Sequence, residues 1–593
     1  MPGLALVGRF WPNPPSVVGL AGASVSEQQA QVMRSQQHPL PPAHMAGDAS
    51  RTLARGGAGT PSLRTVAVCD LEHVVREVPR VPLPPQPGTF HLNGHQVLRE
   101  WIASRIEVLS ESRRDTLLDY MRQEGRARKF GTMCSGTDCP SMLYRAYSEA
   151  LGSYGVDAEM VQEFAVERDA VAQRFIQEVF GPEELGCIFA TCAEAASPTK
   201  VARDVRPQFG TRTVATVHDL IAGFPCKDVS NLLQDRSAYR EAIAHGTGRT
   251  GSAFRDILRY LEVHPGARSI ILENVLGLGT RGRGRLFSNL DHCVHALEAL
   301  GWSTACFKLD PRMFGMPVSR RRLWMISLRT DLVTGAGLTL AEFEALAADI
   351  MSEVLDCRMR DLDDFLLPET HPFIQALYGT VDPLQHPARK RPRSAEWFLR
   401  HVAAMERRQA RGQAQLGSGV LEPGHPTMEI LDLFPGLRAL SDRQIAVLTQ
   451  HGMLVNSDTS IRLRDQRTID VSQSAERTRP SLPGQACIVT PGSELFLYHR
   501  LRRSVGYEAM LLQGLHYGQR QERLRAFSGE ELQCLAGNAF NGFCLAAAML
   551  VRELLSAVCH RRAACATLPG QVHLARPASL TDLLMFSEDD DVE

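Results

Sequence analysis

Residues 251–275 read GSAFRDILRYLEVHPGARSIILENV, and this stretch joins an amphipathic helix to a short apolar strand. The side chains of Phe254, Ile257 and Leu261 are spaced to share one face of the helix. The strand candidate, 270–272, follows a turn that contains proline and glycine. A helix that leads directly into a buried strand is typical of a parallel sheet with helical crossovers. The sequence therefore predicts an α/β fold.

The same alternation of short strands and amphipathic helices extends from 126 to 330. Further strands are expected at 130–133, 164–166, 219–222 and 323–328. Two helices are expected at 171–179 and 290–297, and the second stops at Gly301, where a left-handed cap fits. This arrangement predicts a mostly parallel, Rossmann-like sheet with helices on both faces and a smaller inserted domain.

The rest of the chain divides by composition. Residues 1–88 are rich in Pro, Gly, Ala, Ser and Gln without sustained periodicity, which favours disorder, and 89–125 form a helical lead-in. Residues 331–515 mix helices, Pro-rich turns and basic segments, as expected of a separate domain or large insertion. The chain then returns to the first domain through 516–560, and 561–593 form a mostly disordered tail.

Composition and charge exclude several classes of protein. The chain has 593 residues, too many for one ordinary core, and its formal net charge of -1 argues against a protein that coats nucleic acid through bulk positive charge. No apolar run approaches the ~18 residues of a membrane helix, so we expect no membrane contact. The 14 cysteines form no CxxC pair, which favours reduced thiols. The spacing of Cys559, His560 and Cys565 matches no common zinc site, and we expect no metal.

Three groups of reactive or charged side chains lie next to strand ends. Cys226 lies in a Gly-Phe-Pro turn after one strand, and Glu273 ends the strand that follows along the chain. Arg320 and Arg322 precede the last strand of the series. Taken singly, each group has an ordinary explanation as a buried thiol or as solvated charge. Because the carboxyl ends of parallel strands converge on one crevice, we expect the groups to form one site.

The chain resembles the cytosine-5 methyltransferase family in seven segments. The family's Pro-Cys loop is matched by GFPCKDVSN, its Glu-Asn-Val strand end by IILENV, and its Arg-x-Arg segment by FGMPVSRRRLWMISL. The acidic segment that binds the cofactor ribose is matched by FAVERDAVAQ, and the closing cofactor motif by LAGNAFNGF. The opening stretch and EAMLLQGLH complete the series, which keeps the family order over roughly 130 to 555. The chain is therefore identified as a member of this family.

The resemblance implies a Rossmann-like methyltransferase domain, a target-recognition domain within 331–515, and DNA (cytosine-5-)-methyltransferase activity with S-adenosylmethionine. Cytosine C5 is a weak nucleophile, so a thiolate must first add at C6, and the resemblance gives this role to Cys226. Glu273 matches the residue that contacts cytosine N3. Arg320 and Arg322 would hold the cytosine carbonyl, Glu273 and the thiol-bearing loop. These arginines and a helix amino end are expected to lower the pKa of the thiol.

The cofactor site implied by the resemblance draws on four segments. It comprises Cys134, Ser135, Gly136, Thr137, Glu167, Arg168, Phe224, Pro225, Asn538 and Ala539. Glu167 would bind the ribose hydroxyls, and Gly136 would let the backbone approach the methionine moiety. The chain departs from the family where Cys134 and Asp138 replace the common Phe and Gly, and where Arg168 replaces an apolar residue.

Contacts to nucleic acid are expected at two places. Ser230 matches a phosphate-contacting position, although a helix N-cap would explain it equally. The second place is a basic run that includes Arg389, Lys390, Arg391 and Arg393. The span 388–413 holds eight Lys or Arg against two Glu, which suits phosphate contact and nuclear import, although a solvated helix face has the same pattern. Since C5 and C6 lie inside the base stack, the target cytosine must be flipped out.

Three functions fit these observations. They are methylation of double-stranded DNA, methylation of transfer RNA by the same chemistry, and nucleic-acid binding by a catalytically idle relative. The RNA branch typically carries a Cys-Phe-Thr signature and a short recognition region, and this chain lacks the signature and has a long insertion. An idle relative should have lost Cys226, Glu273 or an arginine, and all are present. We therefore expect a DNA methyltransferase of the nucleus, with organelle targeting left open by the acid-poor start of the chain.

Overall fold

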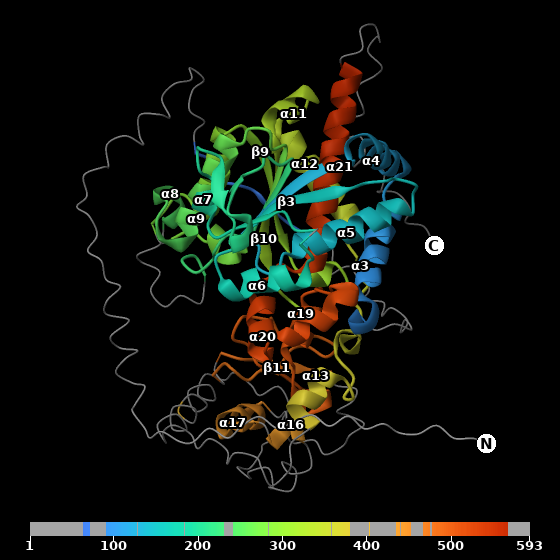
Figure 1. Cartoon of the computed structure of the whole chain (residues 1–593), viewed down its shortest axis with the longest axis vertical. Coiled ribbons are helices and arrows are strands. Elements are labelled where there is room, and N and C mark those ends of the chain that lie inside the picture. The colour runs from blue at the N-terminus through green and yellow to red at the C-terminus, as the bar shows by residue number, and fades with distance from the viewer. Residues whose placement is uncertain are drawn as a thin grey trace, which may run out of the picture. The chain divides into compact units, whose positions relative to one another are not determined.

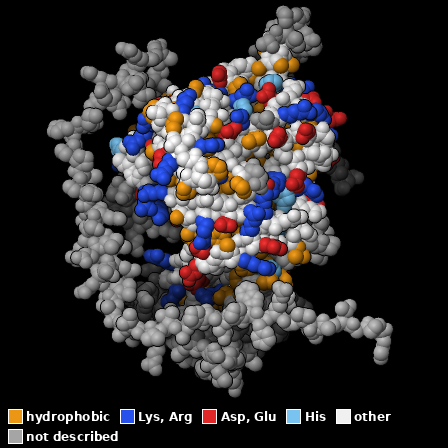
Figure 2. Space-filling model, in the orientation of Figure 1, with side chains coloured by type: hydrophobic (Ala, Val, Ile, Leu, Met, Phe, Trp, Pro, Cys, Tyr) orange, Lys and Arg blue, Asp and Glu red, His pale blue; other side chains and the backbone are white. Residues whose placement is uncertain are grey.

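The computed structural model describes five main ranges of the chain. These are 63–71, 90–230, 241–379, 435–451 and 466–566, with residue 403 and with short gaps at 127, 183, 283, 357, 439 and 475–476. The predicted disorder of residues 1–62, 72–88 and 567–593 lies outside the described residues, as does the basic run 388–393. Basic and acidic side chains are interspersed on the face shown in Figure 2, as the net charge of -1 would suggest.

The central sheet has eight strands in the order β1-β9-β10-β8-β7-β2-β3-β4. Figure 1 shows this sheet flanked by helices. Its strands are β1 (Val68–Asp70), β2 (Arg128–Met133), β3 (Met160–Val166), β4 (Cys187–Phe189), β7 (Asp219–Ala222), β8 (Ser269–Val275), β9 (Trp302–Leu309) and β10 (Arg322–Arg329). Strand β10 is antiparallel to both of its neighbours, and the other pairs of strands are parallel. The predicted mostly parallel sheet is confirmed.

Two separate apolar clusters cover the two faces of this sheet. One face packs against α5 (Cys139–Gly152), α6 (Ala170–Val179), α12 (Leu340–Val354) and α21 (Gly542–Ala566). The other face packs against α7 (Cys192–Ala195), α9 (Gly248–Val263) and α10 (Asn289–Ala299). The alternation of side chains along each strand supplies both clusters: Ile271 joins the first, while Ile270 and Leu272 join the second. The fold is therefore a Rossmann-like α/β domain.

Local sequence patterns explain why these helices form where they do. In α9, Phe254, Ile257 and Leu261 are buried on one face, as their spacing predicts. Helix α10 begins at a Ser288 capping box and ends before Gly301, which has a φ of 80°. The left-handed cap predicted at Gly301 is confirmed.

Smaller elements complete the domain. Helices α3 (Phe90–Glu107) and α4 (Glu111–Glu124) form the predicted lead-in, and the apolar face of α3 packs into the first cluster. The remaining elements are α8 (Ala242–His245), α11 (Thr330–Gly335), α13 (Pro372–Ile374) and the antiparallel pair β5 (Val201–Arg203) and β6 (Thr211–Thr213).

The prediction of disorder throughout residues 1–88 is wrong for 63–71. Strand β1 lies in this segment and pairs in parallel with β9 at the edge of the sheet. The Arg64 guanidinium forms ion pairs with Glu298 at 2.8 Å and with Glu344 at 2.9 Å. These pairing and ionic contacts hold the segment against residues more than 200 positions away, so composition alone could not reveal them.

Two predicted domain boundaries are also wrong. Helices α11 and α12 lie beyond residue 330, yet Val333, Phe343 and Ile350 belong to the apolar cluster of the first domain. The inserted domain therefore begins after α12. At the other end, α21 continues to Ala566 instead of ending near 560, because the helix remains packed against α4.

The inserted region contains a small domain with its own apolar core. It comprises α16 (Pro435–Arg438), α17 (Asp442–Gln450) and the antiparallel strands β11 (Thr468–Asp470), β12 (Leu495–Leu497) and β13 (Arg502–Arg503). Helices α19 (Gly506–Leu512) and α20 (Gly529–Asn538) follow it along the chain. Within β13 the buried Arg502 forms an ion pair with Glu508 of α19, with Nη2 2.8 Å from Oε1. Such a pair fixes the position of β13 relative to α19.

Helices α20 and α21 include one stretch, Gly529–Ala566, that is long and apolar enough to cross a membrane by length and composition. Of its most apolar window, 94% is buried inside the protein. The buried core helix of a globular domain has the same composition. Packing against the sheet and α4 therefore accounts for the apolar character of this stretch.

Candidate active site

The loop that carries Cys226 begins directly after β7 and is held by hydrogen bonds from two sides. The side-chain Nδ2 of Asn274 donates to the carbonyl of Phe224 at 3.0 Å. Thr250 donates its backbone N–H to Asp228 Oδ2 at 2.7 Å, and Asp228 N–H donates back to Thr250 Oγ1 at 3.3 Å. The loop is therefore tied to β8 and to α9, and Cys226 is half-buried within it.

Glu273 lies on β8, the strand next to β7. A Cβ atom on Gly223, at the start of the loop, would lie 3.7 Å from Glu273 Oε2 and 2.8 Å from the ring of Phe540. Only glycine fits this close approach, because any side chain would meet Phe540. The structure thus brings Glu273 beside the loop that carries Cys226, as the sequence predicted.

The two predicted arginines have different surroundings. Arg322 forms an ion pair with Glu273, with Nε 3.1 Å from Oε1. Arg320 is buried and donates to three carbonyls, those of Val489 at 2.7 Å, Gly537 at 3.0 Å and Ala539 at 2.9 Å. Its Nε has no hydrogen-bond partner among the described residues.

Arg322 therefore pairs with Glu273 directly, whereas Arg320 affects Glu273 through its charge. Arg320 also joins the segment that precedes β12 to the end of α20. Its positive charge lies close enough to the site to act on the pKa of Cys226 and Glu273.

Burial dominates the electrostatics of the site. It raises the pKa of the Cys226 thiol, the negative charge of Glu273 raises it further, and the positive charges of Arg322 and Arg320 offset this only in part. Burial likewise raises the pKa of Glu273 against the same two arginines. Burial and the neighbouring charge of Arg322 lower the pKa of Arg320 to about 9. Both arginines therefore lower the thiol pKa as expected, but desolvation outweighs them and the net shift is upward.

A second group of predicted residues lies at the carboxyl ends of β2 and β3. Gly136 donates its N–H to Glu167 Oε2 at 2.7 Å, and Asp169 donates its N–H to Glu167 Oε1 at 2.8 Å. Gly136 has a φ of 57°, and a Cβ placed on it would meet only the carbonyl of Asn538, at 4.0 Å. An acidic side chain, a backbone donor and open space therefore meet at one place.

These residues fit a ligand that carries hydroxyl groups. Each carboxylate oxygen of Glu167 can accept more than the one hydrogen bond that it receives from the backbone. Burial raises the pKa of Glu167, and the backbone hydrogen bonds oppose this change. The buried hydroxyl of Thr137, in the same loop, has no hydrogen-bond partner among the described residues.

The loop departs from the family pattern at Asp138, and the structure gives a reason. Asp138 has a φ of 49°, in the left-handed region that glycine prefers and that aspartate tolerates better than most residues. Its carboxylate is buried and accepts hydrogen bonds from Thr132, Ser141 and Gln162. Burial raises its pKa to about 6, and these hydrogen bonds oppose the rise.

The remaining predicted residues lie in varied surroundings. Phe224 is buried against Phe254, with ring centroids 5.4 Å apart, and Ser135 is buried with its hydroxyl donating to Val166. Arg168 and Asn538 are exposed, and Ala539 is buried. Cys134, Pro225 and Ser230 are half-buried. The predicted contacts of Arg389, Lys390, Arg391 and Arg393 with DNA lie outside the described residues.

Sequence reasoning missed several residues that shape the site. The Cys226 loop is contacted by Asn274, Thr250 and Phe540. The ring of Phe540 also packs against Trp324, with the ring centroids 5.9 Å apart. Asn274 had a signal, since it directly follows Glu273. Within the described ranges, no group of three or more His, Cys, Asp or Glu side chains is placed to hold a metal ion.

Comparison with known proteins agrees with this geometry. A model of the C-5 cytosine-specific DNA methylase family matches residues 192–370, a span that includes Cys226, Glu273 and both arginines. The chain is 25% identical over 480 residues to the DNA (cytosine-5-)-methyltransferase DMT5 of Cryptococcus neoformans, covering 77% of this chain and 18% of that protein. It is 31% identical to the type II methyltransferase M.MspI of Moraxella sp. over 116 residues, which cover 19% of this chain and 25% of that protein.

The aligned chain thus spans less than a fifth of the fungal DMT5 protein. Among solved structures, the S. pombe Dnmt2 methyltransferase aligns with a TM-score of 0.33 and 13% identity, covering 72% of this chain and 98% of that one. The sheet order, the site and the family match are mutually consistent. Residues 192–370 carry a domain of the C-5 cytosine-specific DNA methylase family, and this domain contains Cys226, Glu273 and both arginines.

Proposed function

We propose that the chain is a DNA (cytosine-5-)-methyltransferase that transfers a methyl group from S-adenosylmethionine to C5 of a flipped cytosine. One observation carries this proposal: the loop of Cys226 begins beside Glu273, which is itself paired with Arg322. The family match and the methyltransferase relatives support it.

In the proposed reaction, Cys226 loses its proton and its sulfur adds to C6 of cytosine. The new Sγ–C6 bond moves electron density to C5, which can then accept a methyl group. Loss of the C5 proton and breakage of the Sγ–C6 bond release 5-methylcytosine and restore Cys226. Because burial raises the pKa of this thiol, the thiolate must form within the enzyme–substrate complex or at alkaline pH.

Glu273 has the role of stabilising the base during this addition. Its raised pKa increases the fraction of neutral carboxyl that can donate a hydrogen bond to cytosine N3. Arg322 holds Glu273 in place through the ion pair at 3.1 Å. The carboxyl and the thiol loop then face the same base, with Gly223 leaving room between them.

S-adenosylmethionine, when bound, supplies an electrophilic methyl group. Glu167 would accept hydrogen bonds from its ribose hydroxyls, and Gly136 would leave room for its methionine part. The hydroxyl of Thr137 and the turn at 538–539 would close the same crevice.

Double-stranded DNA is the proposed substrate, and the nucleus is the proposed compartment. The long inserted region and the basic span 388–413 favour DNA over transfer RNA. Ser230, at the end of the Cys226 loop, would contact the displaced backbone.

The experiment incubates the full chain with radiolabelled cofactor and either duplex DNA or transfer RNA. We expect label in DNA. Label in RNA alone would assign the transfer RNA reaction and overturn the choice of substrate. In parallel, a duplex that contains 5-fluorocytosine should form a denaturant-resistant adduct with the wild type and none with Cys226→Ser. Absence of both label and adduct in the wild type would favour an idle relative.

A further inference from the structure

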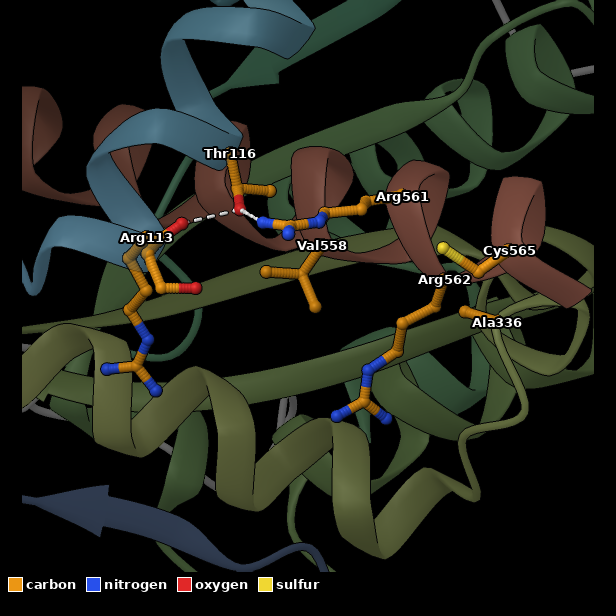
Figure 3. A pocket seen from close by; sticks show the side chains of 8 residues that line it. Arg113, Thr116, Ala336, Val558, Arg561, Arg562 and Cys565 are labelled. Carbon is orange, nitrogen blue, oxygen red and sulfur yellow. Dashed lines mark hydrogen bonds between the residues drawn. The ribbon is translucent and has the colours of Figure 1, made fainter. Parts of the chain in front are cut away.

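A pocket lies on the protein far from the candidate active site. It has a volume of about 500 Å³ and lies between α4 and the last turns of α21 (Figure 3). Its lining comprises Ser112, Arg113, Thr116, Ala336, Val558, Arg561, Arg562 and Cys565. We call it the arginine pocket.

Helix α21 separates this pocket from the candidate active site. The helix has 25 residues and is therefore about 37 Å long, and its other end begins next to Asn541, beside the candidate active site. The arginine pocket is a separate site.

The charge of this lining is unbalanced. It contains three guanidinium groups and no carboxylate. Arg113 is neutralised from outside the pocket by Asp349 and Glu353 on α12. Arg561 and Arg562 have no carboxylate partner among the residues that the structure describes.

Among the described residues, Arg561 donates to the hydroxyl of Thr116 alone (Figure 3). Arg562 has no hydrogen bond or ion pair within the part of the chain that the structure describes, although its charge acts on Glu342. Each guanidinium has five N–H donors in a fork that suits carboxylates. Most of these donors remain open on Arg561 and Arg562, so the pocket has the chemistry of an anion site.

The lining is apolar as well as basic. In Figure 3 Val558 lies between Arg113 and Arg562, and Ala336 lies beside Cys565; both provide a surface for aliphatic or aromatic side chains. A ligand that matches the whole lining must therefore combine apolar side chains with adjacent negative charges. A lone inorganic anion would leave the apolar part uncovered.

The chain contains a segment of this chemistry. Residues 583–593 read LLMFSEDDDVE, four apolar residues followed by Ser587 and then by Glu588, Asp589, Asp590, Asp591 and Glu593. We propose that the arginine pocket binds this acidic segment in cis, with 583–586 on Val558 and Ala336 and the carboxylates on Arg561 and Arg562. The segment itself lies outside the described residues.

The distance along the chain permits this contact. Cys565 lines the pocket one residue before α21 ends at Ala566, so 567–582 provide the connection. Sixteen residues span at most about 55 Å when extended, which allows a return to the last turns of the helix. A connection of this length also gives an effective concentration in the millimolar range, so weak individual contacts are sufficient.

The test uses disulfide trapping in the full chain. Ser587→Cys places a thiol beside the acidic run, and Cys565 is exposed in the lining. Cys534, which is also exposed but lies on α20 near the other end of α21, is the matched control thiol. Under mild oxidation with diamide at low salt, peptide mapping should show at least tenfold more 587–565 than 587–534 disulfide.

Charge reversal separates specific binding from random collision. R561E/R562E should lower the yield of the 587–565 disulfide to that of the control, and adding D589R/D590R should restore it. If R561E/R562E fails to fold, R561Q/R562Q replaces it, and we then expect a smaller fall in the yield of the 587–565 disulfide. The proposal is overturned if the two disulfides form equally or if charge reversal has no effect. Disulfides that join two chains instead of one would also overturn it and would assign the pocket to a second copy.

Discussion

At the scale of single residues, the thiol of Cys226 illustrates the competition between burial and charge. Two arginines lie near it, yet its pKa is raised because it is desolvated and because the charge of Glu273 opposes ionisation. A raised thiol pKa means that the thiolate fraction increases as pH rises toward that pKa. The neutral thiol is therefore favoured in the free protein, and the proposed nucleophile ionises as substrate binding or alkaline conditions favour the thiolate.

The pH dependence of adduct formation tests this arrangement. With excess 5-fluorocytosine duplex under single-turnover conditions, we expect the rate to rise continuously from pH 7 to pH 9. The sign follows from the raised pKa of Cys226, since the reactive form is the deprotonated one. A rate that is flat over this range would show that the thiol is already ionised at neutral pH.

Glu273 provides a second test at the same scale. Glu273→Gln keeps the shape of the side chain but removes its proton-donating carboxyl, and we expect the rate of adduct formation to fall by about 10² to 10⁴. Binding of the cofactor, measured by calorimetry, should be unchanged, because the cofactor residues lie at other strand ends. An unaltered rate would remove Glu273 from the reaction.

At the scale of elements, the Cys226 loop depends on its reciprocal hydrogen bonds with α9. Thr250→Val keeps the volume of Thr250 but removes the hydroxyl that accepts from Asp228, and we expect about a tenfold loss of adduct rate. Thr250→Ser should restore most of the rate. If both variants lose the same adduct rate and both have a lower melting temperature, the role of Thr250 is purely structural.

A buried ionic cluster joins α21 to the start of the sheet. Asp219 on β7 pairs with Arg128 at 2.6 Å and with Arg552 at 3.5 Å, and Glu553 completes the cluster. Burial opposes ionisation of Asp219, but the charges of both arginines lower its pKa to about 2. Its stabilising contribution is therefore present above the ordinary pKa of about 4 and is lost as pH falls through about 2.

Removing one charge from this cluster should destabilise the protein strongly. Asp219→Asn leaves the buried arginines uncompensated, and we expect the free energy of unfolding to fall by about 3–5 kcal/mol. Asp349→Asn is the control, since Asp349 is 62% exposed in its pair with Arg113 and should change stability by less than about 1 kcal/mol. Urea denaturation at pH 7 measures both. Equal effects of the two changes would contradict the assigned role of the cluster.

Elements with a local pattern could be predicted from the sequence, and elements without one could not. Strand β7 has the bounds expected for it, and the apolar face of α9 was evident from its spacing. Strands β1 and β4 have three residues each, too few for any periodicity, and they form because neighbouring strands pair with them. Arg320 donates hydrogen bonds to Val489, 169 residues further along the chain, and to Gly537, 217 residues further along. No local sequence signal could reveal such contacts.

At the scale of the whole molecule, the edge strand β1 covers β9 with a segment that precedes the rest of the domain. Deleting residues 1–60 leaves β1 and Arg64 in place and should leave the melting temperature unchanged. Deleting residues 1–71 exposes the backbone of β9 and removes both ion pairs of Arg64, so we expect a lower melting temperature and aggregation. Equal melting temperatures for the two deletions would show that β1 does not stabilise the sheet.

The three carbonyls that accept hydrogen bonds from Arg320 limit where the inserted region can be exchanged with that of a relative. One acceptor belongs to Val489 and the other two belong to the turn that closes the methyltransferase domain. A chimera whose junctions both lie between 380 and 467 keeps this unit intact. A junction between 486 and 491 would move one acceptor away from the guanidinium, and the grafted segment would lose its alignment with Glu273.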